Sequence, residues 1–247
     1  QVTITANSTT KITVPNDPKP IRVYTVKQEK GTNKPLAGAV YNVYTDRACT
    51  KPAKVYDPNT HKETNTNAAL TTKANGESDD VYLLCRESYW ILEVIPPKGY
   101  SLDPDPEKRK QEIKGSKPGG RYHRVYENEE LDVYLQVKKT FSNSALTNGN
   151  ACYNYAGAVF NVYKDSPNTS AITTLTTNAA GVTEAKKVGK PGVYYVREIK
   201  APPGYALDPT PKGPFTLTAD NASIETAYKG PFVVTVPNHP LADPIDS

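Results

Sequence analysis

The sequence is poor in several residue types: its 247 positions include no methionine, one tryptophan, four phenylalanines and three cysteines. It also lacks any apolar run long enough to cross a bilayer, so we expect no membrane segment. Three cysteines are too few for the several disulfides of a small secreted scaffold. Because the chain starts at Gln1 with neither a methionine nor a signal peptide, we expect it to be a fragment of a longer chain.

Dense positive charge is missing as well. The formal net charge is only +4, with lysine and arginine spread along the chain, so nucleic acid is not an expected partner. The longest basic run, EKRKQEIK at 107–114, alternates with acidic residues and predicts a solvated edge strand. The three histidines, His61, His123 and His239, show no metal-ligand spacing, and no Ser- or Cys-based triad is indicated. We therefore expect no metal, no cofactor and no enzyme with turnover.

Tyrosine, by contrast, occurs 17 times, and few stretches show the 3.6-residue apolar period of a helix, which favours strands and turns. Two stretches repeat each other: WILEVIPPKGYSLDP at 90–104 and YYVREIKAPPGYALDP at 194–209. Their surroundings repeat too, as LAGAVYNVYTD at 36–46 and YAGAVFNVYKD at 155–165. The repeat predicts an all-β chain of two tandem Ig-like β-sandwich domains, each with about seven short strands.

The repeats also set the expected domain limits. We place the first domain at 19–134, the second at 135–242 and a C-terminal tail at 243–247. Residues 1–18 are interpreted as tail strands of a preceding domain or as an N-terminal extension. Residues 46–80 are polar and rich in Asn, Thr, Lys and Pro, which predicts long loops around one short strand.

Three polar residues recur in matched positions of the two repeats. They are Lys27 and Lys139 at the end of the first strand, Glu93 and Glu198 in the strand before Pro-Pro, and Asn128 and Asn238 at the end of the last strand. The two-residue period of a strand aims each lysine inward, and this phase favours Lys139 over its neighbour Lys138. A Lys and a Glu inside a core are costly unless they are paired and neutralised.

Burial would give these residues their chemistry. Desolvation lowers the pKa of a lysine and raises that of a glutamate, which yields a neutral amine and a protonated carboxyl group. The amine can then attack the side-chain carbonyl of the asparagine, while the glutamate polarises that carbonyl and shuttles protons. The expected product is one Lys–Asn isopeptide bond per domain, formed once by the protein on itself, with Glu93 and Glu198 as the catalytic residues.

The pattern K-x8-LAGA…E-x-x-x-P-x-GY…N resembles the Cna protein B-type domain, also called the SpaA-like or prealbumin-like domain. The resemblance covers residues 19–242 and implies a β-sandwich with an intramolecular Lys–Asn bond and a catalytic Glu or Asp. Such domains build the stalks and pilins of Gram-positive surface proteins. The chain departs from the pattern in having YAGA for LAGA in the second repeat and no proline after Asn128 in the first.

The resemblance implies an extracellular fragment of a cell-wall-anchored surface protein or pilus, with a structural or adhesive role. Its expected partners are other domains of the same surface protein or pilus. The alternative is a module that binds a host extracellular matrix protein or glycan through the loops at 46–80 or 140–155. Cys49 and Cys85 both fall in the first repeat and form either a disulfide or two free thiols, while Cys152 has no counterpart.

Overall fold

The structure is a computed structural model that describes residues 6, 7, 9, 11, 18–115, 117–141, 147–225 and 227–241, with Phe141 by its backbone alone. The chain divides into two compact units, Gln1–Glu129 and Glu130–Ser247. The limit expected after residue 134 falls inside the first strand of the second unit. The predicted tails at 1–18 and 243–247 lie outside the described residues, apart from the isolated positions just named and residue 18.

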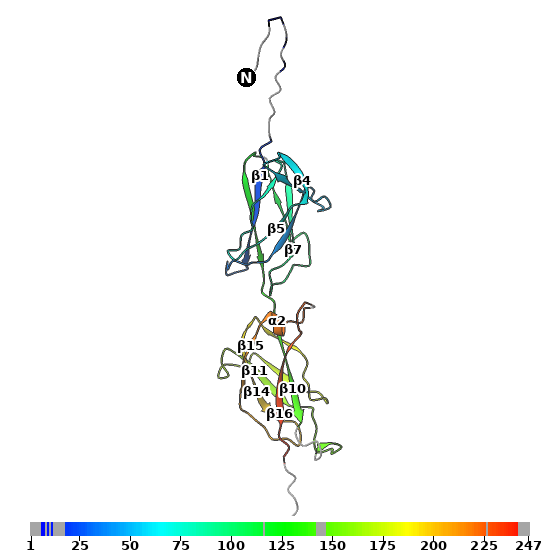
Figure 1. Ribbon diagram of the computed structural model, residues 1–247. Helices are drawn as coiled ribbons and strands as arrows, with labels where there is room; N and C mark the ends of the chain where they lie inside the picture. The colour runs from blue at the N-terminus through cyan, green and yellow to red at the C-terminus, as the bar shows by residue number, and fades with distance from the viewer. Residues whose placement is uncertain are drawn as a thin grey trace, which may run out of the picture. The chain divides into compact units, whose positions relative to one another are not determined.

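The first unit is a β-sandwich of two sheets, with a separate two-stranded hairpin (Figure 1). Its strands are β1 (Ile21–Glu29), β2 (Val40–Tyr44), β3 (Lys54–Asp57), β4 (Lys62–Asn67), β5 (Ala69–Thr71), β6 (Val81–Leu83), β7 (Tyr89–Ile95), β8 (Lys110–Ile113) and β9 (Arg121–Asn128). One sheet has the order β6-β1-β9 and the other β5-β2-β7-β8. Strand β8 is therefore at an edge, which confirms the edge strand predicted from the basic run.

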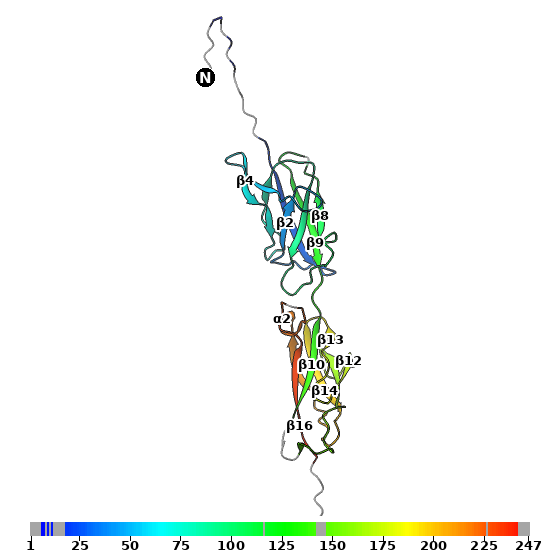
Figure 2. The same ribbon diagram turned by 90° about the vertical axis from the view of Figure 1, so that its right-hand side faces the viewer.

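The second unit repeats this arrangement. Its elements are β10 (Val133–Phe141), β11 (Val159–Lys164), β12 (Thr173–Thr176), β13 (Lys186–Gly189), β14 (Gly192–Lys200), β15 (Lys212–Leu217), the short helix α2 (Ala219–Ala222) and β16 (Phe232–Asn238). The sheets have the orders β13-β10-β16 and β12-β11-β14-β15. Strands β10 and β16 lie side by side in both views (Figures 1 and 2). The prediction of an all-β fold of two sandwich domains is confirmed.

The first and last strands of each unit pair with each other in parallel, although they come from opposite ends of the domain sequence. Strand β1 pairs with β9, and β10 pairs with β16. All the other strand pairs within the four large sheets are antiparallel. A parallel neighbour cannot follow through a tight turn, so the intervening chain must build the second sheet before it returns. This topology places the chain ends of each sandwich on adjacent strands.

The polar region at 46–80 is more ordered than the sequence predicts. It forms three strands, β3, β4 and β5, instead of one. Strands β3 and β4 make a separate two-stranded sheet that projects from the side of the first unit (Figure 2). Five of the six β4 residues are exposed, so the strand has no alternation of apolar and polar residues by which a sequence pattern could find it.

Each unit has its own apolar core between its two large sheets. Tyr41, Ile91 and Leu83 are fully buried in the first, and Phe160, Val196 and Leu135 in the second. Among the residues that the structure describes, no helix is long and apolar enough to cross a membrane.

Candidate functional site

The parallel strand pairs fix where the predicted lysines and asparagines lie. In the first unit Lys27 is opposite Tyr126, and Asn128 is the second residue beyond that partner. In the second unit Lys139 is opposite Val236, and Asn238 again lies two residues further on. Residues two apart on a strand share a face, so each asparagine sits diagonally beside its lysine on the inward face of the sheet.

The first site joins Lys27, Glu93 and Asn128 in a closed hydrogen-bonded ring. Lys27 Nζ donates to Asn128 Oδ1 at 2.6 Å and to Glu93 Oε2 at 2.8 Å. Asn128 Nδ2 donates to the other carboxylate oxygen, Glu93 Oε1, at 3.0 Å. Lys27 is 0% exposed, Glu93 2% and Asn128 7%, so the ring is closed off from bulk water. The structure thus brings together all three predicted residues of the first unit.

Burial shifts both ionisable groups of this ring toward their neutral forms. Desolvation lowers the pKa of the Lys27 amine, and the Coulomb attraction of Glu93 only partly opposes this effect. Desolvation likewise raises the pKa of the Glu93 carboxyl group against the opposing attraction of Lys27. Both shifts favour moving the proton from the amine to the carboxylate, which leaves an uncharged pair.

Two tyrosines cover the first site. The Tyr41 and Tyr126 ring centroids are 4.6 Å apart, and Lys27 Nζ lies 5.8 Å from the centroid of Tyr126. Tyr126 donates its hydroxyl to the Ile91 carbonyl at 2.8 Å, whereas the buried Tyr41 hydroxyl has no hydrogen-bond partner among the described residues. Burial raises the pKa of both phenols. These rings exclude water from the lysine, a role that sequence analysis did not assign to them.

The second site brings the same kinds of residue together with a different set of contacts. Lys139 Nζ donates to Glu198 Oε1 at 2.9 Å and to the Pro237 carbonyl at 3.3 Å. Lys139 is 1% exposed, Glu198 2% and Asn238 0%. The neighbouring Lys138 is exposed, in keeping with the inward phase expected for Lys139.

Phe160 and Val236 take the places of the two tyrosines in the second site. Phe160 pairs with Glu198 as Tyr41 pairs with Glu93, and Lys139 Nζ lies 5.5 Å from the centroid of the Phe160 ring. Glu198 has a further contact, because its Oε2 accepts the backbone N–H of Asp208 at 3.2 Å. The Lys139 amine is therefore lined by an apolar ring where its counterpart faces tyrosines.

The geometry of the first site suits an acyl transfer from the asparagine to the lysine. An uncharged lysine amine is a nucleophile, and its nitrogen already contacts the amide oxygen of Asn128. The two oxygens of Glu93 contact the two nitrogens between which a proton must move in such a transfer. In the second site, Lys139, Glu198 and Asn238 are buried in the same way.

The cysteines and histidines form no comparable cluster. Cys49, Cys85 and Cys152 are all free, so the alternative of a Cys49–Cys85 disulfide is not realised in the structure. The two sulfurs point to different places: Cys85 Sγ donates to the Gly115 carbonyl at 3.0 Å, and Cys49 Sγ to the Arg47 carbonyl at 3.8 Å. Within the described ranges, no three His, Cys, Asp or Glu side chains are grouped so that they could hold a metal ion.

Comparison with known families identifies the fold and the repeat. The sequence model of the SpaA family, described as a prealbumin-like fold domain, matches residues 22–119 and 147–230. The chain belongs to this family. The resemblance predicted from the repeated motifs is thereby confirmed, and each match falls within one of the two structural units. No curated protein matches the chain.

Solved structures with similar folds include pilins and a fragment of a pilus adhesin. The Bacillus anthracis TIE protein is 18% identical over 90% of this chain and 34% of its own, with a TM-score of 0.49. A streptococcal ancillary pilin is 20% identical over 92% of this chain and 64% of its own, with a TM-score of 0.41. The C-terminal fragment of the pilus adhesin SpaC from Lactobacillus rhamnosus GG is 16% identical over 92% and 98%, with a TM-score of 0.36.

The chain thus spans about a third of the first of these structures and just under two thirds of the second. With identities of 20% or less, they show a shared fold.

Proposed function

We propose that this chain is a self-cross-linked stalk segment of a Gram-positive cell-surface protein or pilin. Each unit is closed by one intramolecular isopeptide bond, Lys27–Asn128 in the first and Lys139–Asn238 in the second. The proposed location is extracellular, on a cell-wall-anchored protein or a pilus, and the proposed partners are neighbouring domains of that assembly. The chain has no turnover activity, because each site acts once and is consumed.

One observation carries this proposal: the Lys27 amine contacts both Asn128 Oδ1 and a carboxylate inside the core. A buried lysine–glutamate pair by itself is weak support, since such pairs are often no more stabilising than apolar residues of the same size. The third member makes the difference. An amide oxygen at 2.6 Å from the amine gives the pair a reaction partner, and the diagonal offset recurs in the second unit.

In the first site, the proposed reaction transfers the acyl group of the Asn128 side chain to the Lys27 amine. The lone pair of neutral Lys27 Nζ attacks Asn128 Cγ, and a C–N bond forms while protonated Glu93 donates to Oδ1. Glu93 then takes a proton from Nζ and delivers one to Nδ2, which its other oxygen contacts at 3.0 Å. The Cγ–Nδ2 bond then breaks and ammonia leaves, while the carbonyl re-forms and the Oδ1 proton returns to Glu93, so an amine and a primary amide become a secondary amide plus ammonia. Glu93 ends as it began, protonated.

The position of the bond explains its use in a stalk. It joins β1 to β9, the first and last strands of the first unit, across a span of 101 residues. A force that enters through β1 and leaves through β9 then passes through a covalent bond, so the core does not have to resist it. A protease likewise meets a domain whose ends cannot separate, and reducing conditions have no effect on the bond.

The test is the intact mass of the chain, measured with and without reduction. Each bond removes about 17 mass units, because one ammonia is lost per acyl transfer. We expect a deficit of about 34 mass units that survives reduction, and a deficit of half that size in Lys139→Ala. Lys138→Ala, which alters an exposed neighbour of Lys139, is the matched control and should keep the full deficit.

Peptide mapping then locates each bond. Digestion should yield one branched peptide that joins Lys27 to Asn128 and a second that joins Lys139 to Asn238. An intact mass equal to the calculated mass of the unmodified chain would overturn the proposal, and both triads would then be polar core residues only. A deficit that disappears on reduction would point to disulfides and would overturn it equally.

A further inference from the structure

The first unit has a depression on the outer face of its four-stranded sheet, away from the cross-linking site. Its volume is about 600 Å³, and it is lined by Thr45, Arg86, Glu87, Ser88, Trp90 and Glu112. Trp90 belongs to β7, where Tyr89, Ile91 and Glu93 point inward and Trp90 therefore points outward. The only tryptophan of the chain thus lies in a solvent-facing hollow and not in the core.

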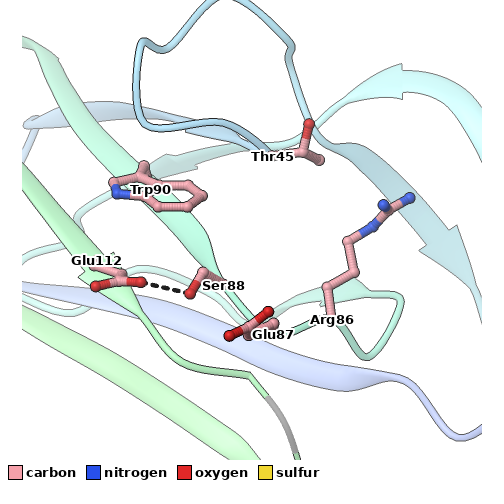
Figure 3. Close-up of a pocket in the computed structure, with 6 residues that line it drawn as sticks. All are labelled: Thr45, Arg86, Glu87, Ser88, Trp90 and Glu112. Atoms are coloured by element: carbon pink, nitrogen blue, oxygen red, sulfur yellow. Dashed lines mark hydrogen bonds between the residues drawn. The ribbon is translucent and has the colours of Figure 1, made fainter.

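Strand register builds this depression. Trp90 is the direct cross-strand partner of Tyr44 on β2 and of Glu112 on β8. Figure 3 shows Trp90 and Glu112 on one side of the hollow and Arg86 on the other, with Ser88 and Glu87 between them. Ser88 Oγ donates to Glu112 Oε1 at 2.5 Å, which fixes this carboxylate beside the indole ring.

The polar groups of the depression have unused hydrogen-bonding capacity. Arg86 makes an ion pair with Glu63 of the β4 strand, with Nη2 and Oε1 3.6 Å apart, and its side chain is 46% exposed. Across the described part of the chain, neither Glu87 nor Glu112 takes part in an ion pair. The hollow therefore presents two carboxylates and a half-exposed guanidinium around one aromatic face.

The second unit differs at the position that corresponds to Trp90. Tyr195 occupies the position of Trp90, but the ladder between β14 and β15 is irregular there. A Cβ on Gly213 would lie 2.8 Å from Tyr195 Cδ1, so the backbone of the neighbouring segment lies against the ring. The hairpin that supplies Glu63 to the first unit is a feature of the 46–80 region, and it holds Arg86 at the rim. The surface around Trp90 in the first unit therefore differs from the corresponding surface of the second unit.

We infer that this depression binds a neutral saccharide, with a pyranose ring stacked on Trp90 and its hydroxyl groups bonded to Glu112, Glu87 and Arg86. A pyranose has an apolar face of C–H groups that suits an indole ring and a rim of hydroxyls that both donate and accept. The two carboxylates repel an anionic sugar, whereas a neutral ligand with many hydroxyls meets no such penalty. Arg86, although paired with Glu63, is half exposed and can donate to a hydroxyl.

The experiment uses the intrinsic fluorescence of the whole chain, in which Trp90 is the sole indole reporter. Lactose, cellobiose and N-acetylglucosamine are titrated separately, and Nα-acetyl-lysine amide is the cationic comparison. We expect at least one neutral saccharide to shift or quench the emission saturably, and the lysine derivative to have no effect.

Variants locate the binding, measured by saturation-transfer NMR on the saccharide so that the readout does not need the indole. Trp90→Ala should weaken binding at least about tenfold, and Glu112→Ala several-fold. Tyr195→Ala, the matched change in the second unit, should bind as the unaltered chain does. Circular dichroism shows that each variant is folded, so the binding result does not depend on whether the isopeptide bonds form.

Three outcomes would overturn the inference. One is the absence of any response to the three saccharides up to about 50 mM, far above the millimolar dissociation constants of weak ligands. Another is binding that neither Trp90→Ala nor Glu112→Ala weakens. The third is saturable binding of the lysine derivative alone, which would assign the depression to a basic peptide segment.

Discussion

The two units use the same backbone frame around their buried lysines and differ in what surrounds them. In each, the lysine and the asparagine come from a parallel pair of first and last strands with the same two-residue offset. In the first unit the lysine contacts the asparagine side chain, and in the second it contacts the Pro237 carbonyl. Strand topology therefore sets which residues share a site in both units.

The residue that pairs with the buried glutamate differs between the two sites. The first site carries a buried tyrosine hydroxyl, that of Tyr41, beside Glu93, whereas the second carries Phe160 beside Glu198. A buried hydroxyl without a partner costs free energy that an apolar ring does not. The first site is thus lined by a tyrosine with a buried hydroxyl, where the second site is lined by a phenylalanine.

The largest expected effect comes from removing either lysine. Lys27→Met and Lys139→Met should each abolish one of the proposed cross-links, which span 101 residues and 238 − 139 = 99 residues. Closing a loop of about 100 residues stabilises a domain by about 4.7 kcal/mol, so each change should lower the melting temperature of its own unit by roughly 20 °C or more. Differential scanning calorimetry resolves the two transitions, and Trp90 fluorescence assigns the first unit.

Because the two loops are almost equal in length, we expect almost equal losses. If only Lys27→Met lowers a melting temperature, the second unit is not cross-linked. The two sites would then share their backbone arrangement but not their reaction. Lys138→Met is the control, since it changes an exposed lysine on the same strand.

A second prediction concerns the pH dependence of bond formation in the first unit. The pKa of Lys27 is lowered from the ordinary 10.5 and that of Glu93 is raised from the ordinary 4.5, in both cases mainly by desolvation. The reactive pair holds one proton. At pH values below the two shifted pKa values, a second proton makes the amine an unreactive ammonium. At pH values above them, the carboxyl group has lost the proton that it must donate. The rate should therefore peak between pH 4.5 and 10.5 and fall about tenfold per pH unit outside the peak.

The measurement uses the Lys139→Met variant, so that only the first unit reacts. The chain is produced as insoluble protein, dissolved in concentrated urea and refolded by dilution at a series of pH values, and the intact mass is followed with time. A rate that rises steadily with pH across the whole range would contradict the shared-proton mechanism and would favour direct attack by an amine with an ordinary pKa.

The smallest effect is expected from exchanging the aromatic residues that distinguish the sites. Tyr41→Phe removes a buried hydroxyl that has no partner among the described residues, and should raise the free energy of unfolding of the first unit by about 1 kcal/mol. Phe160→Tyr should lower that of the second unit by about 1–3 kcal/mol. Urea unfolding followed by Trp90 fluorescence and by circular dichroism reports the two values. Loss of stability in Tyr41→Phe would mean that the hydroxyl serves the site.

Much of the fold follows from local patterns. Alternating residues predict the inward position of Lys27 and Lys139, and both are buried. The basic run at 107–114 predicts the edge strand β8. The hairpin of β3 and β4 escapes prediction, because a strand exposed on both faces has no apolar period. Strand β4 pairs with β3, whose Tyr56 is buried, so the hairpin depends on a partner strand that the β4 sequence does not reveal.

By itself, the sequence determines the repeat, the family, the all-β class and the choice of three inward polar residues per unit, because these follow from the order of residue types along single strands. Only the tertiary structure decides that Lys27 contacts Asn128 while Lys139 contacts the Pro237 carbonyl, and that Trp90 lies between Tyr44 and Glu112 in a hollow. Those contacts join strands far apart in the chain. Their registers are set by packing of the whole sandwich, which no local pattern encodes.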